Sequence, residues 1–235
     1  MISRIERWAP IAGIVFVVLM VVGSMLVSNV PSPNAPQHQI AGYLTDGAQQ
    51  TRNIIGAYLW VVGALTFLVF LMRLRDDLRR AEGGTGYLSN LAFGAGVAFA
   101  AVWMVSAAIS ASVAYAIRLR GAPVANADLV RVLPPLGRLL LLLGGGFAGV
   151  LVLLAASAVI IQTGVFARWL AWLGVVAAIV LLFDVVYRDI SPFWVWVFIT
   201  SVVMLTRRGE KARTPLSASL EEAGTTREEA GTTVA

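Results

Sequence analysis

Two long stretches without a charged side chain constrain this chain more than any other feature of its sequence. Residues 9–29 and 139–167 contain no Asp, Glu, Lys, Arg or His. A helix of about 20 apolar residues crosses a hydrocarbon core ~30 Å thick, and only a helix satisfies its own backbone hydrogen bonds there. The whole chain is 58% hydrophobic and 13% charged, against about 25% charged residues in soluble domains. The sequence therefore predicts an all-α, polytopic protein of the cell (plasma) membrane.

Six apolar segments are long enough to be predicted as transmembrane helices, in one domain covering residues 1–206. They are residues 9–30, 54–72, 88–117, 135–162, 169–187 and 192–206. The first apolar run exceeds the roughly 7–15 residues of a signal-peptide core, which favours an uncleaved helix. With a cytoplasmic N-terminus, twelve of the 18 basic residues lie on the inner side. This excess predicts that both termini are cytoplasmic, although four arginines between residues 118 and 138 oppose the rule.

Two regions outside these spans have a distinct composition. In the first outer loop, Ile40, Tyr43 and Leu44 have the spacing of one helical face, which predicts a short amphipathic helix at the membrane interface. An ordinary polar connector is the alternative. Residues 207–235 contain EEAGTT twice and few residues that could form a core. They are predicted to be a disordered cytoplasmic tail, either a solvated spacer or a docking segment.

Small residues four positions apart predict close helix packing, because they let two backbones approach in lipid. The pairs are Gly94 and Ala98, Ser106 and Ser110, and Gly145 and Gly149. We expect them to join the third and fourth spans, with a second copy of the chain as the alternative partner of the last pair. GGGFAG at 144–149 also matches a dinucleotide-binding pattern, but its position inside a span excludes that function.

Few residues offer chemistry. The chain has no cysteine and one histidine, His38, so neither a metal site nor a cofactor is predicted. Asp76 and Asp77 lie among four arginines, which predicts an ion-paired helix extension, with an anionic-lipid patch as the alternative. The basic residues lie at helix ends, so nucleic acid is not an expected partner. Membrane lipids, a second copy or another membrane protein are the expected partners.

The loop between the last two apolar segments carries the strongest candidate site. Asp184, Arg188 and Asp189 are charged, and the helices on either side are only about 22 Å long up to this loop. The third and fourth spans reach about 45 Å and 42 Å. We therefore expect the loop to floor an outward-facing crevice between longer helices. Asp184 and Arg188 are four residues apart and are predicted to pair, with Arg138 as the less favoured partner. A pair that merely stabilises a short hairpin is the alternative.

Three classes of function fit this pattern. The first is a non-enzymatic membrane protein that binds a lipid, a small hydrophobic ligand or a membrane-protein partner through the crevice. The second is a small transporter, which would need broken helices or charges near the middle of the membrane. The third is a lipid-active membrane enzyme, which would need clustered acid, base or metal-binding residues.

Several segments together resemble a group of uncharacterised six-helix membrane proteins of actinobacteria. They are RWAPIAG (7–13), QIAGYLTD (39–46), GAYLW (56–60), LRDDLRRAEGG (74–84), LAFGAGVAFA (91–100) and TGVFARWLAWLG (163–174). The resemblance covers roughly residues 5–206. It implies a six-helix membrane fold and a membrane location, and it supplies no catalytic residue.

Overall fold

The computed structural model describes residues 2–27, 31–32, 34–121, 127–183 and 190–207, and the secondary structure of these residues is entirely helical. The elements are α1 (Ile2–Val27), α2 (Gln37–Thr45), α3 (Gly47–Glu82), α4 (Tyr87–Arg120), α5 (Ala127–Leu140), the π-helix η1 (Leu141–Gly145), α6 (Gly146–Thr163), α7 (Arg168–Leu182) and the helix Ser191–Arg207. Four helical stretches are long and apolar enough to cross a membrane: α1, α3, α4 and the continuous run α5–η1–α6. The predicted all-α class is confirmed for the described residues, and these four stretches have the length and composition of membrane-spanning helices.

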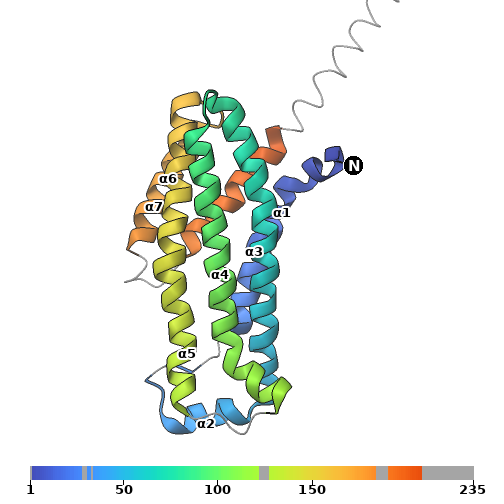
Figure 1. Ribbon diagram of the computed structural model, residues 1–235, viewed down its shortest axis with the longest axis vertical. Coiled ribbons are helices and arrows are strands. Elements are labelled where there is room, and N and C mark those ends of the chain that lie inside the picture. The colour runs from blue at the N-terminus through green and yellow to red at the C-terminus, as the bar shows by residue number, and fades with distance from the viewer. Residues whose placement is uncertain (1, 28–30, 33, 122–126, 184–189, 208–235) are drawn as a thin grey trace, which may run out of the picture.

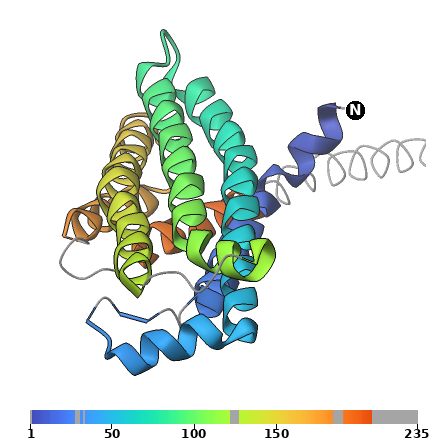
Figure 2. The same cartoon turned by 60° about the horizontal axis from the view of Figure 1, so that its bottom comes forward.

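Three long helical columns form the body of the molecule (Figure 1). They are α3, α4 and α5–η1–α6, and α1 runs obliquely along α3. The short helix α2 lies across one end of the columns, called the α2 end below, where it contacts α3 and α5 (Figure 2). The hairpin formed by α7 and the Ser191–Arg207 helix lies beside the opposite half (Figure 1). The columns therefore continue toward α2 beyond the hairpin.

The helices differ in length from the predicted spans in two ways. Helix α3 has 36 residues, about 54 Å at 1.5 Å per residue, because its backbone hydrogen bonding continues past residues 54–72 into polar sequence. Helix α7 ends at Leu182 after 15 residues, about 22 Å, and so stops five residues before the predicted end of its span. Hydropathy locates the apolar part of a helix, whereas capping residues decide where the helix ends.

Local contacts explain several of these ends. Asp46 caps α3, since its carboxylate accepts hydrogen bonds from the backbone N–H groups of Ala48 and Gln49 at 2.9 and 3.0 Å. The carboxylate of Glu82, at the end of α3, accepts the N–H groups of Leu88 and Ser89, both at 2.9 Å, and the Ser89 hydroxyl. One carboxylate thus closes the turn between α3 and α4 and caps α4.

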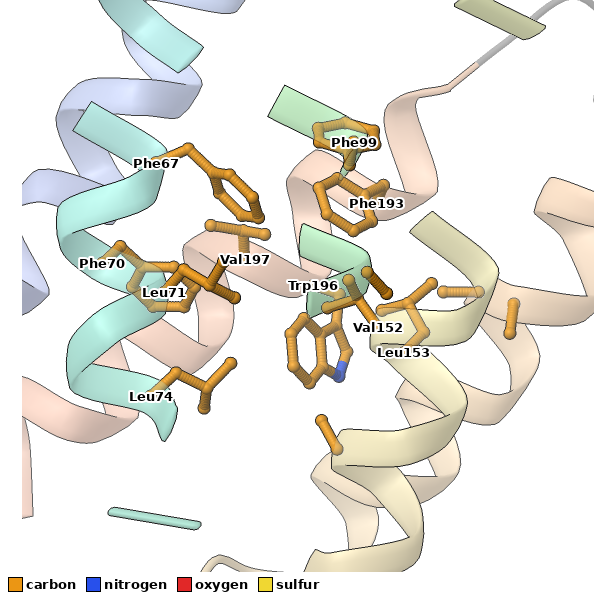
Figure 3. Close-up of a cluster of buried hydrophobic side chains, with 14 of the residues drawn as sticks. Phe67, Phe70, Leu71, Leu74, Phe99, Val152, Leu153, Phe193, Trp196 and Val197 are labelled. Carbon is orange, nitrogen blue, oxygen red and sulfur yellow. The ribbon is translucent and has the colours of Figure 1, made fainter. Parts of the chain in front are cut away.

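Aromatic side chains from several helices meet in the core (Figure 3). Phe67 on α3 is fully buried and lies with its ring centroid 5.0 Å from that of Phe16, 5.5 Å from Phe99 and 5.7 Å from Phe193. Phe99 and Phe193 are 4.5 Å apart. These contacts join α1, α3, α4 and the Ser191–Arg207 helix, so the hairpin is packed into the bundle by ring contacts.

One close helix crossing was not predicted. A Cβ atom added at Gly56 of α3 would lie 2.8 Å from the carbonyl oxygen of Gly23, and one added at Gly23 of α1 would lie 2.9 Å from the carbonyl oxygen of Gly56. Any side chain at either position would therefore meet backbone. The two glycines are not four positions apart on one helix, so a search for that spacing misses them.

Of the predicted packing residues, Gly94 and Ala98 are wrongly assigned within this chain. Both are exposed, and a Cβ atom at Gly94 would meet nothing within 4 Å. Gly96, on the adjoining face of α4, is the close contact instead, because its Cβ atom would lie 2.4 Å from Leu71 Cδ2. Spacing alone does not say which face of a helix is covered.

The other two predicted pairs differ in their partners. A Cβ atom at Gly149 would lie 3.0 Å from Leu181 Cδ2, so this glycine faces the hairpin and not α4. Gly145 is buried, and its nearest neighbour would be Leu141 of its own helix at 3.1 Å. Ser106 and Ser110 of α4 do contact the predicted fourth span: the Ser106 hydroxyl donates to the Gly137 carbonyl at 2.6 Å, and a Cβ atom at Gly137 would lie 2.5 Å from the Ser110 hydroxyl.

Candidate functional site

The predicted charged site is only partly covered by the structure. Asp184, Arg188 and Asp189 lie outside the described residues, so their pairing and the crevice stay predictions. Arg138 lies exposed on α5, six positions before Gly144. Of the described residues that flank them in the sequence, Leu181 packs on Gly149, and Ile190 is buried.

A cluster of tryptophans lies where the Ser191–Arg207 helix begins. The Trp194 ring, in the first turn of this helix, is 6.0 Å from the ring of Trp103 on α4. Trp103 is also 6.0 Å from Trp60 on α3, at an interplanar angle of 87°. Trp103 is only 2% exposed, whereas Trp194 is partly buried. The three rings thus run from α3 through α4 to the start of the hairpin's second helix.

The indole N–H groups of this region differ in their partners. Trp60 donates to the Met20 carbonyl at 3.4 Å, and Trp196 donates to the Leu170 carbonyl at 3.2 Å. The Nε1 atoms of Trp103 and Trp194 are buried and have no acceptor among the residues that the structure describes. A buried donor without a partner costs about 1–3 kcal/mol, and tryptophan normally finds one. An indole N–H is fixed in the ring plane and cannot turn toward the backbone as a hydroxyl can. The pair is therefore the strongest candidate site among the described residues.

The backbone that faces Val102, the neighbour of Trp103 in the sequence, is irregular. The five residues of η1 form a π-helix between α5 and α6, and π-helical segments in α-helices occur frequently at functional sites. A Cβ atom at Gly144 in η1 would lie 3.2 Å from Val102, the neighbour of Trp103. The irregular turn and the tryptophan pair therefore lie at the same level of the bundle.

A second polar cluster fastens α2 to α3. The buried Gln50 side chain donates to the carbonyls of Tyr43 and Leu44 at 3.1 and 2.9 Å, and Asn53 donates to the Tyr43 hydroxyl at 2.9 Å. Burial raises the pKa of the Tyr43 phenol above its ordinary 10.0, although the bond from Asn53 partly offsets this. Ile40 is fully buried with Tyr43 and Leu44. The predicted short helix is confirmed, and its apolar face packs on the protein.

The apolar partners of α2 are Val113 of α4 and Val130 of α5. Both are buried, so α2 bridges the two columns as well as adjoining α3. This arrangement gives α2 a structural role that accounts for its apolar face.

The opposite end of the bundle is polar and basic. Arg73 pairs with Asp77 at 2.7 Å, four residues away on α3, which confirms the predicted ion-paired extension for this pair. Arg75 donates to the Asn90 side chain at 3.0 and 2.8 Å and lies 5.0 Å above the Phe93 ring. These contacts bind the exposed ends of α3 and α4 to each other.

The described residues contain no candidate metal centre, and the comparisons with known proteins identify no function. No group of three His, Cys, Asp or Glu side chains that could hold a metal ion occurs within the part of the chain that the structure describes. Comparison with protein-family models, with curated proteins and with solved structures gives no match. The resemblance to actinobacterial membrane proteins stays a prediction.

Sequence reasoning missed Trp103 and Trp194, although a signal was present. Tryptophan in membrane proteins is enriched at the two interfaces, where the exposed Trp169 and Trp172 begin α7. Trp103 instead lies in the middle of the predicted span 88–117. A tryptophan far from both ends of a span therefore indicates a core or site residue.

Proposed function

We propose that this protein is a non-enzymatic, multi-pass protein of the plasma membrane that binds a lipid or another small hydrophobic ligand at Trp103 and Trp194. The observation that carries the proposal is the pair of buried indole donors for which the described part of the chain offers no acceptor. A hydrophobic ligand that bears an acceptor oxygen would satisfy both donors and keep its remaining atoms among apolar side chains.

The proposed topology has six helical segments and both termini in the cytoplasm. In this arrangement α2 lies on the outer side, and the hairpin of α7 and the Ser191–Arg207 helix enters and leaves on the cytoplasmic side. Helix α7 extends about 22 Å by helical rise, short of a ~30 Å core. Helix α7 therefore ends below the proposed outer boundary while α4 and α5 continue, and this difference in length supports the proposed outward-facing crevice.

Ligand entry requires a local movement at Trp194. Neither indole nitrogen reaches the surface in this conformation, but the Trp194 ring is partly exposed and lies in the first turn of its helix. Rotation of this ring, or displacement of the helix start, would expose both N–H groups. Trp103 is held among Phe99 and Trp60 and is the fixed part of the site.

A small transporter is the second candidate. The observation in its favour is η1, because helices with an irregular turn are typical of transport sites. A lipid-active enzyme is a weaker alternative, since the described residues offer no cluster of acids, bases or metal ligands near the tryptophans.

Native mass spectrometry of the purified protein tests the proposal. The protein is extracted in a glycoside detergent, and the lipids it retains are identified after release in the gas phase. The wild type should retain a lipid, and the Trp103→Phe/Trp194→Phe variant should retain less of it. Trp172→Phe is the matched control, because Trp172 is 63% exposed on α7 and should leave retention unchanged. Equal retention in all three proteins would refute the site.

A further inference from the structure

We propose that the acceptor at Trp103 and Trp194 is the ester carbonyl of a diacyl glycerolipid from the outer leaflet. This inference rests on the proposed function and adds the ligand class. It is drawn from the kind of groups that the site offers and from the depth at which they lie.

The two tryptophans offer donors only. An indole has one N–H and no acceptor, so the pair presents two donors. A carbonyl oxygen has two lone pairs and no proton, and is the natural complement. A hydrocarbon would leave both donors unpaired, and a hydroxyl would bring a proton of its own that needs an acceptor. Trp103, which contacts Trp194, is otherwise in contact with the rings of Phe99 and Trp60, so the surroundings suit an uncharged carbonyl rather than a phosphate.

The depth of the pair points to the ester region. Gly144, which lies against the neighbour of Trp103, is about 28 Å by helical rise from Thr163 at the end of α6. Trp60 is about 20 Å from Arg73, the first charged residue beyond its span. In the proposed topology both reference residues mark the cytoplasmic boundary of a ~30 Å core. The tryptophans then lie in the outer leaflet, within reach of the border where ester groups join acyl chains to headgroups.

A pair of lipids that differ only in the carbonyl tests the inference. The binding of a diacyl phosphatidylcholine is compared with that of the dialkyl ether analogue of equal chain length, by lipid titration and native mass spectrometry. The wild type should bind the ester lipid about tenfold more tightly, the effect of two net hydrogen bonds. In Trp103→Phe/Trp194→Phe this preference should disappear. Loss of ring packing weakens both lipids alike, so the ratio of the two affinities reports the N–H groups alone.

The outcomes separate the two proposals. Equal wild-type affinity for the ester and ether lipids, with both weakened in the double variant, would overturn the ester assignment and leave the lipid site in place. Failure of the wild type to bind either lipid would overturn both. An ester preference that persists unchanged in Trp103→Phe/Trp194→Phe would place the carbonyl elsewhere and overturn the assignment. Trp172→Phe should keep the wild-type ratio.

Discussion

Replacement of Gly56 by alanine should loosen the crossing of α1 and α3. The added Cβ atom would lie 2.8 Å from the carbonyl oxygen of Gly23 and 2.7 Å from a methyl carbon of Val27. The methyl group can rotate away, but the carbonyl belongs to the backbone, so the helices must separate by several tenths of an ångström. Overpacking of this kind costs about 1–3 kcal/mol. Alanine also stabilises a helix by about 1 kcal/mol relative to glycine. The measured loss of stability is therefore smaller than the cost of the clash.

Gly94→Ala supplies the matched control. Gly94 is helical and exposed, and its added Cβ atom would meet nothing within 4 Å. The helix-propensity gain is common to both variants, so the difference between them isolates the clash at about 1–3 kcal/mol. At about 2–4 °C per kcal/mol, Gly56→Ala should unfold roughly 2–12 °C below Gly94→Ala in detergent. Equal unfolding midpoints would refute the close crossing of Gly23 and Gly56.

Three further predictions concern other contacts. Gly149→Leu should destabilise the protein by about 2–3 kcal/mol, because its side chain would push the hairpin away from α6 at Leu181; an unfolding midpoint and an oligomeric mass equal to those of Gly149→Ala would contradict this. In a spectrophotometric titration, Tyr43 should ionise above the ordinary phenol pKa of 10.0, and Tyr43→Phe should lack that step. Because the folded pKa of Tyr43 is raised, its contribution to stability is complete below pH 10 and is lost as pH rises through the folded value. Finally, Arg188→Ala should lower stability more than Asp184→Asn, and the double variant should recover part of the loss; additive losses would show that the two residues do not interact.

The sequence predicts the helices well because charge-free runs and helix-ending residues are local features. The short helix α2 is an example: Ile40, Tyr43 and Leu44 have helical spacing, and all three are buried. What covers them depends on Val113 and Val130, which are distant in sequence, so the same pattern was compatible with a lipid surface.

The candidate site could not be predicted from the sequence because it also depends on contacts between residues that are distant in sequence. Whether the N–H of Trp103 has an acceptor depends on which carbonyls of other helices lie within reach, and spacing along one helix does not contain that information. Gly94 and Ala98 show the same limit, since small-residue spacing marks a helix face suited to packing without showing which face meets a neighbour.

The indole ¹H–¹⁵N signals of the protein test the central claim most directly. The chain has seven tryptophans, and single Trp→Phe variants assign the signals of Trp103 and Trp194. In a glycoside detergent, which has no carbonyl group, addition of a diacyl lipid should move both indole protons downfield while the signal of the exposed Trp172 stays in place. Movement of Trp172 with no change at Trp103 and Trp194 would show that lipid contacts only the outer surface, and the binding site at the two buried indoles would be contradicted.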